Sequence, residues 1–131
     1  MTIGRHLIAD LCGCDRTLLQ NEIKLIDIFT NALQSSDVNI LAYSSYKFPG
    51  EGGVTGIFLL SESHSSFHSY PEFGYVAVDI FTCGVTDPVR IMAALRSDLS
   101  ASSEDCQILL RGGIISNNIT HIPLRLKVSS V

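Results

Sequence analysis

The chain has 131 residues and a formal net charge of −4, with 46% hydrophobic and 17% charged residues. This length suits one domain with a substantial buried core. The nine Lys and Arg residues are scattered, which argues against the clustered basic surface of a nucleic-acid-binding protein. No apolar run approaches the roughly 18 residues of a membrane-spanning helix, and no secretory signal is visible at the N-terminus. We therefore expect residues 1–131 to form a single cytoplasmic domain.

Four cysteines lie at positions 12, 14, 83 and 106. Without a secretory signal we expect them to be reduced thiols. One residue separates Cys12 from Cys14, whereas zinc-binding pairs are commonly spaced Cys-x-x-Cys, and no second close pair exists. His64 and His68 are four residues apart, but their segment lacks a helical pattern and no third ligand is evident. We expect no metal site.

The first third of the chain predicts a strand followed by a helix. Residues 6–13 alternate between apolar and polar side chains, which indicates a half-buried strand. Asp15 is a good N-cap residue, and apolar side chains then recur at helical spacing as far as Leu33. The spacing predicts one continuous helix over 16–34, whose broad apolar face belongs to the core.

Two strands and a loop are expected in the middle of the chain. Residues 38–46 form the next predicted strand, and the Pro- and Gly-rich residues 49–53 predict a loop. Residues 54–61 alternate again, which predicts a third strand antiparallel to the second. Residues 65–73 are typical of a connection, and residues 74–83 are apolar on both faces, as in a central strand.

The C-terminal part predicts a helix and two strands. Asp87 and Pro88 form an N-cap followed by proline at the first helical position, and apolar residues recur as far as position 99. A strand is expected around 106–110, and residues 121–128 alternate around a proline, which predicts an edge strand. Residues 9–14 align with 78–83 at an offset of 69, so we favour a duplicated βαββ unit. The expected fold is α+β, a two-layer sandwich of an antiparallel sheet packed on two helices.

Reactive side chains gather in residues 60–84, between two apolar segments. The chain carries Ser-Glu-Ser-His at 61–64, His68, Pro-Glu at 71–72 and Asp-Ile-Phe-Thr-Cys-Gly at 79–84. This pattern resembles the prokaryotic class of S-adenosylmethionine decarboxylases, which are pyruvoyl-dependent and cut their own chain. Shorter matches at 4–7 and 53–56 extend the resemblance over roughly positions 4–100.

The resemblance implies that Ser63 is both the cleavage site and the source of the cofactor. Its hydroxyl would attack the carbonyl carbon of Glu62 and convert the amide into an ester. β-Elimination would then split the chain into residues 1–62 and 63–131, and hydrolysis would leave a pyruvoyl group at residue 63. Serine is a weak nucleophile unless a base and an oxyanion donor are positioned beside it, so other residues must assist.

The resemblance also assigns the other site residues. His68 resembles the histidine that moves protons during processing, and Thr55 stands where relatives usually have serine to stabilise the intermediate. Cys83 resembles the proton donor of the decarboxylation, a task that needs a protonated thiol. The substrate-binding residues implied are Phe48, Tyr70 and Glu72, with aromatic faces for the sulfonium and adenine and a carboxylate for the ribose hydroxyls.

The resemblance implies a homodimer of cleaved protomers, (αβ)₂, with S-adenosylmethionine as substrate. We expect each site to take residues from both protomers. The product would be the aminopropyl donor for spermidine synthesis. Two alternatives stay open: a pyruvoyl-dependent arginine decarboxylase, because some archaeal relatives are similar in sequence, and a non-catalytic α+β binding module that retains the motif.

Overall fold

A computed structural model describes residues 3–113 and the backbone of a strand at 125–129. Its strands are β1 (Gly4–Cys12), β2 (Ile40–Lys47), β3 (Val54–Leu60), β4 (Ser63–Tyr70), β5 (Tyr75–Cys83), β6 (Ser103–Arg111) and β7 (Arg125–Ser129). All seven pair antiparallel in one sheet, in the order β2-β3-β4-β5-β1-β6-β7. The helices are α1 (Arg16–Leu19), α2 (Glu22–Gln34), α3 (Pro88–Asp98) and the short 3-10 helix η1 (Pro71–Phe73).

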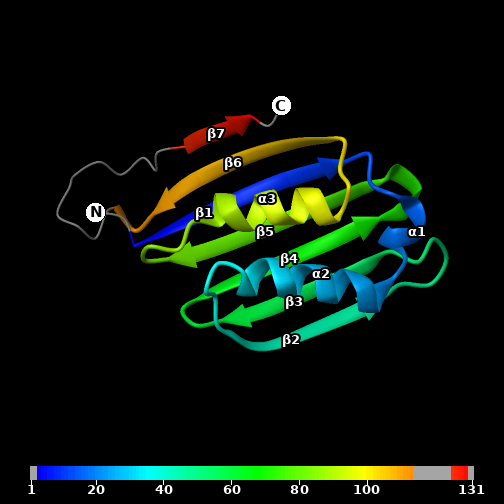
Figure 1. The fold of residues 1–131 in the computed structure, drawn as a ribbon, viewed down its shortest axis with the longest axis horizontal. Helices are drawn as coiled ribbons and strands as arrows, with labels where there is room; N and C mark the ends of the chain where they lie inside the picture. The colour runs from blue at the N-terminus through cyan, green and yellow to red at the C-terminus, as the bar shows by residue number, and fades with distance from the viewer. Residues whose placement is uncertain (1–2, 114–124, 130–131) are drawn as a thin grey trace.

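The two long helices lie side by side on one face of the sheet, which makes the two-layer α+β sandwich expected from the sequence (Figure 1). Each begins at a side-chain cap: Asn21 accepts from the amide of Lys24 at 3.0 Å, and Asp87 accepts from that of Val89 at 3.0 Å. Strand, helix and hairpin follow one another twice, at β1-α2-β2-β3 and at β5-α3-β6-β7, with β4 as an additional strand between them.

The core fills the space between the helices and the sheet. Phe29 of α2 stacks on Phe67 of β4 with ring centroids 4.2 Å apart, and on Phe58 of β3 at 6.3 Å. All three rings are fully buried. Gly56 of β3 leaves the room that Phe67 needs, because a Cβ there would lie 2.3 Å from the phenyl ring. The aromatic core therefore depends on a residue without a side chain.

The predicted helix over 16–34 is interrupted, and this prediction was wrong in detail. The chain leaves the helical conformation at Asn21, whose φ of −96° and ψ of 94° are extended. Asparagine favours this arrangement because its side chain caps the next helix. The break lets Leu19 reach the core at the end of α1, where it is fully buried.

The interpretation of residues 65–73 as a connection was also wrong. Residues 63–70 form β4, which pairs with β3 and β5 along its length. Its buried serines are satisfied by hydrogen bonds: Ser65 donates to the carbonyl of Asp79 at 3.0 Å, and Ser69 donates to the carbonyl of Leu19 at 2.9 Å. The other predicted strands agree with the structure to within a few residues, except that positions 121–124 of the last one lie outside the described residues.

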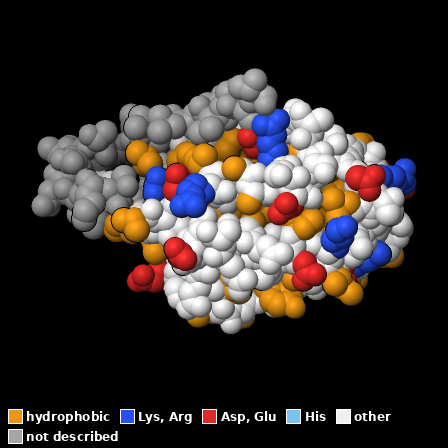
Figure 2. All heavy atoms as spheres, in the orientation of Figure 1, with side chains coloured by type: hydrophobic (Ala, Val, Ile, Leu, Met, Phe, Trp, Pro, Cys, Tyr) orange, Lys and Arg blue, Asp and Glu red, His pale blue; other side chains and the backbone are white. Residues whose placement is uncertain are grey.

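Within residues 3–113, no helix lies on the second face of the sheet (Figure 1). The side chains of β4 and β1 that point to it alternate with the buried ones, as the period of a strand requires. On the helix-bearing side, acidic and basic side chains are interspersed rather than gathered by sign (Figure 2). Among the described helices, none is long and apolar enough to cross a membrane.

Candidate active site

The implied cleavage site lies in the tight turn between β3 and β4. Leu60 pairs with Ser63, so only Ser61 and Glu62 form the connection. Glu62 has a φ of +60°, a left-handed conformation that is unfavourable for residues other than glycine. The Ser63 hydroxyl donates to the carbonyl of Ser61 at 3.2 Å. The peptide bond between Glu62 and Ser63 is therefore held next to a strained residue.

Cys83 ends β5 beside this turn. Its thiol lies 3.9 Å from a carboxylate oxygen of Glu62 and is half-buried. The following loop is fixed by Arg5, whose guanidinium donates to the carbonyl of Thr86 at 2.9 Å, and by Thr82, whose hydroxyl donates to the same carbonyl at 3.2 Å. The structure thus brings Cys83 next to Glu62, the residue before Ser63, and we call Glu62, Ser63 and Cys83 the turn group.

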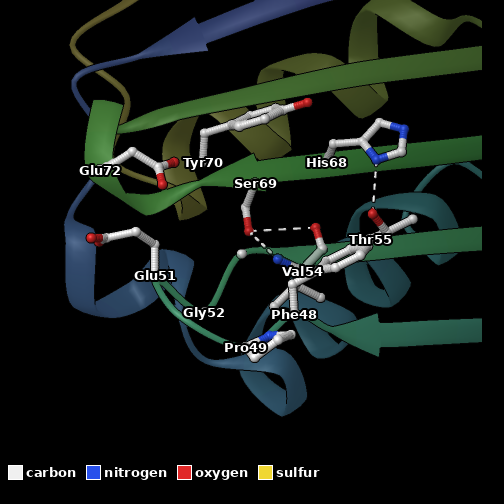
Figure 3. A pocket seen from close by; sticks show the side chains of 11 residues that line it. Phe48, Pro49, Glu51, Gly52, Val54, Thr55, His68, Ser69, Tyr70 and Glu72 are labelled. Carbon is white, nitrogen blue, oxygen red and sulfur yellow. Dashed lines mark hydrogen bonds between the residues drawn. The ribbon is translucent and has the colours of Figure 1, made fainter.

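The other five predicted site residues line a pocket of about 540 Å³ (Figure 3). They are Phe48, Thr55, His68, Tyr70 and Glu72. The loop after β2, the ends of β3 and β4, and η1 form its walls. Residues as many as 24 positions apart, Phe48 and Glu72, therefore meet at one place, and we call these five residues the pocket group.

A hydrogen bond of 2.8 Å joins Thr55 Oγ1 to His68 Nδ1 in this pocket (Figure 3). The two residues lie opposite each other in the pairing of β3 with β4. The register of the hairpin therefore places the histidine and the hydroxyl together, as a processing histidine and its hydroxyl partner would need to be.

Tyr70 lies against a second aromatic ring. Its ring stacks on that of Tyr75 with centroids 5.4 Å apart. The Tyr75 hydroxyl donates to Asp10 at 2.5 Å, and this hydrogen bond, with burial and the Asp10 charge, raises the pKa of Tyr75 to about 12. The hydroxyl stays protonated at neutral pH, so the bond that holds this ring pair persists.

Sequence reasoning missed Glu51, which lines the pocket with Glu72 (Figure 3). Glu51 forms an ion pair with Arg16 of α1, and its carbonyl accepts from the Gln20 side chain at 2.9 Å. These contacts fasten the loop to α1. A carboxylate in a glycine-rich loop carries no sequence signal of its own, because only the fold shows that the loop closes over a pocket.

The turn group and the pocket group lie far apart within one chain. Ser63 and His68 are five positions apart on the same extended strand, which separates them by roughly 16 Å. His68 and Thr55 of one chain therefore do not reach the Ser63 of that chain.

Comparison with known proteins identifies the family. A family model described as S-adenosylmethionine decarboxylase matches residues 5–112. An S-adenosylmethionine decarboxylase proenzyme of Shouchella clausii is 37% identical over 112 residues, which cover 85% of this chain and 86% of that protein. One of Methanococcus aeolicus is 36% identical over 114 residues, covering 86% and 97%.

Solved structures agree. The adenosylmethionine decarboxylase of Aquifex aeolicus superposes with a TM-score of 0.76 at 31% identity, over 85% of this chain and 92% of that one. A Trypanosoma brucei AdoMetDC monomer, at 9% identity, shares the fold with a TM-score of 0.62 over 80% of this chain and 45% of that one. These matches favour S-adenosylmethionine over the arginine and non-catalytic alternatives. The chain belongs to the S-adenosylmethionine decarboxylase family of enzymes.

Proposed function

We propose that this decarboxylase is made as a proenzyme that cuts itself between Glu62 and Ser63 and uses the resulting pyruvoyl group to decarboxylate S-adenosylmethionine. The observation that carries the proposal is the β3–β4 turn. It holds a left-handed Glu62 directly before a serine and has the Cys83 thiol 3.9 Å from the Glu62 carboxylate. The product would be the aminopropyl donor for spermidine synthesis.

Backbone strain at Glu62 favours the cut. A non-glycine residue in the left-handed region costs on the order of 1–3 kcal/mol and persists only where the surroundings enforce it. Here the pairing of β3 with β4 on both sides enforces it. Separation of Glu62 from Ser63 releases the turn, so the strain raises the free energy of the uncut chain relative to the product.

The turn group fits a cofactor that is made from Ser63. The pyruvoyl group supplies a ketone for the substrate amine and accepts the electrons released when carbon dioxide departs. Cys83 then has the task of a proton donor, for which a half-buried thiol next to the turn is suitably placed. Glu62, which becomes the end of the shorter chain, remains close to that thiol.

The distance between the two groups supports a site shared by two protomers. The turn group of one chain would meet the pocket group of its partner, so that the partner supplies His68 and Thr55 to Ser63. The uncovered sheet face suits such a contact, because Ile8, Ile57 and Leu59 are 47%, 53% and 55% exposed on it. A second copy would bury these side chains and complete both sites.

The pocket suits the substrate's charge and shape. Phe48 and Tyr70 present the aromatic faces that attract a sulfonium and stack on adenine. The Glu72 carboxylate would accept hydrogen bonds from ribose hydroxyls and attract a cation, whereas the Glu51 carboxylate is paired with Arg16.

Intact mass spectrometry under denaturing conditions tests the proposal. We expect two chains, of 62 and 69 residues, with a ketone on the larger that reacts with a carbonyl reagent. Ser63→Ala should give one uncut chain without the ketone, since alanine has no hydroxyl to attack Glu62. A wild-type protein that stays uncut and still releases carbon dioxide from S-adenosylmethionine would contradict the proposal.

A further inference from the structure

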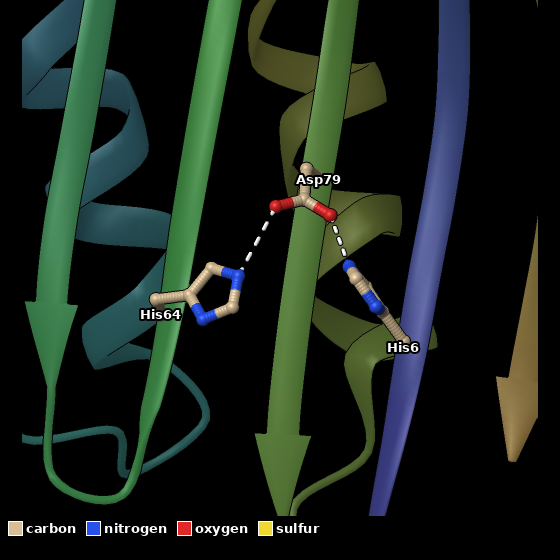
Figure 4. Close-up of side chains that lie close together, drawn as sticks. All are labelled: His6, His64 and Asp79. Atoms are coloured by element: carbon tan, nitrogen blue, oxygen red, sulfur yellow. Dashed lines mark hydrogen bonds and ion pairs between the residues drawn. The ribbon is translucent and has the colours of Figure 1, made fainter. Parts of the chain in front are cut away.

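Three ionisable side chains meet on the uncovered face of the sheet, outside the two groups described above (Figure 4). Asp79 of β5 lies between His6 of β1 and His64 of β4. One carboxylate oxygen contacts Nε2 of His6, and the other lies 3.3 Å from Nε2 of His64. Arg111 of β6 extends the row, with Nη1 3.1 Å from Nδ1 of His6. The row therefore crosses four neighbouring strands.

The arginine fixes the direction of the hydrogen bonds. A guanidinium can only donate, so Nδ1 of His6 accepts and its proton sits on Nε2, which donates to Asp79. The second oxygen of Asp79 lies 3.3 Å from Nε2 of His64, an ion-pair contact. Arg111, His6, Asp79 and His64 thus form a continuous network that ends at His64.

His64 directly follows Ser63 and is the first residue of β4 that pairs with β5, opposite Phe81. Its ring also lies against that of Phe81, with centroids 5.6 Å apart. In the uncut chain the turn holds Ser63 from the other side. After the cut, residue 63 is a chain end, and chain ends fray unless they are tied down.

We infer that His64, held by Asp79 and His6, is a positioning residue that keeps the new chain end at residue 63 in place beside Cys83; this inference rests on the proposed function. Cys83 lies two positions beyond Phe81 on β5, so fraying at His64 moves residue 63 away from the thiol. A displacement of about 1 Å at a reacting group can lower the rate by about 100-fold.

The same three side chains have the spacing of a metal site, with ligand atoms within 4.8 Å of one another. A metal ion on Nε2 of His6 would move the ring proton to Nδ1, where it would face the Nη1 donor of Arg111. Two donors would then oppose each other. The geometry consequently favours the hydrogen-bonded network, and metal binding becomes an outcome of the test.

Hydrogen exchange of the 64–68 segment tests the inference without relying on activity. In the cut protein, the backbone amide hydrogens of this segment should exchange faster in His64→Ala than in the parent. In the Ser63→Ala background, which keeps the turn intact, the same substitution should have little effect. Ser66→Ala is the matched control, because Ser66 donates to the same carboxylate at 3.4 Å but lies away from the chain end.

Kinetics supply the second measurement. We expect His64→Ala to cut itself and to lose about 10- to 100-fold in kcat with little change in KM, because the reacting group is displaced while the substrate pocket is intact. His64→Gln, which keeps an N–H near the position of Nε2, should restore much of the loss. Ser66→Ala should stay close to the parent in both measurements.

Four results would overturn the inference. Equal exchange effects in the cut and uncut backgrounds would make His64 an ordinary packing residue, and unchanged kcat would remove it from the reaction. An uncut His64→Ala chain would place the residue in self-cleavage instead. Stoichiometric Zn²⁺ binding that His64→Ala abolishes, with activity lost on chelation, would establish a metal site. Failure of the proposed function is distinguishable, because the parent itself would then remain uncut.

Discussion

The four cysteines show how differently one chemical group is used within this small domain. Cys14 and Cys106 are 7% and 2% exposed, and burial raises the pKa of each thiol to about 11. Cys12 is exposed, and Cys83 is half-buried at the end of β5. The thiolate is the form of cysteine that reacts as a nucleophile. The two buried thiols are therefore unreactive at neutral pH, because they stay protonated and are shielded from reagents.

Alkylation should separate these classes. At pH 8 we expect iodoacetamide to modify Cys12 and Cys83 well before Cys14 and Cys106, as measured by mass spectrometry of the digested protein. In denaturant all four should react at similar rates, which is the control. Early modification of Cys106 in the folded protein would contradict the burial seen here.

Site residues could be predicted from the sequence more readily than their grouping. Thr55 and His68 were expected to act together, and the β3–β4 register does pair them. Both were also expected to act on Ser63. Within one chain, His68 could reach Ser63 only if residues 65–68 formed a connection that folded back. In the structure these residues belong to the extended strand β4, which separates His68 from Ser63. Because β4 is a strand and not a connection, the expected site residues of one chain lie in two groups, as a site shared between protomers requires.

At the scale of elements, β4 explains why the sequence misled. Serine and histidine dominate it, and neither favours strands. Its alternation is nevertheless regular, because Ser65, Phe67 and Ser69 are buried while His64 and His68 are exposed. The buried serines Ser65 and Ser69 form hydrogen bonds with backbone groups, which offset the cost of burying a hydroxyl. A search for alternating hydrophobic residues does not detect a strand whose buried positions are serines.

The packing of β3 on β4 predicts an unusual cost for a mild substitution. Gly56→Ala should destabilise the protein by about 1–3 kcal/mol, because its new methyl group would overlap the buried ring of Phe67, which Phe29 prevents from moving. Urea unfolding in the Ser63→Ala background would measure this on a single uncut chain.

Gly113→Ala is the control for this substitution, because among the described residues no atom beyond its chain neighbours lies within 4 Å of the added methyl group. It should change the free energy of unfolding by no more than about 0.5 kcal/mol. Equal effects of the two substitutions would contradict the account of the aromatic core.

For the whole molecule, the layer architecture followed from the pattern of amphipathic elements, whereas the strand order did not. Alternating strands and two apolar-faced helices leave few solutions other than a sheet covered on one side. The insertion of β1 between β5 and β6 depends on long-range pairing that no local pattern encodes. The uncovered face, similarly, becomes visible only once both helices lie on the same side.

The proposed sharing of each site between two protomers makes a quantitative prediction for mixed dimers. Cys83→Ala impairs the turn group and Glu72→Ala the pocket group, so each homodimer should be nearly inactive. In a mixed dimer one site combines both defects and the other has neither. Co-expression in equal amounts should therefore restore about a quarter of the parental activity, since half of the dimers of a two-fold symmetric assembly are mixed.

Cys83→Ala paired with Ser63→Ala is the matched control for this experiment. Both substitutions lie in the turn group, so neither site of the mixed dimer would be intact and activity should stay low. Recovery in this pair, or no recovery in the first pair despite confirmed mixed dimers, would contradict the shared site.

The position of β1 has a consequence for the mature protein. The proposed cut between residues 62 and 63 would leave β1, β2 and β3 in the shorter chain, and β4 to β7 in the longer one. The shorter chain then runs through the middle of the longer chain's sheet, between β5 and β6, and also borders it at β4. The two chains cannot part while the sheet exists, and reassembly after unfolding would be a second-order reaction that slows on dilution. The mature form is thereby most easily reached through the uncut precursor, in which the chain folds while it is still one molecule.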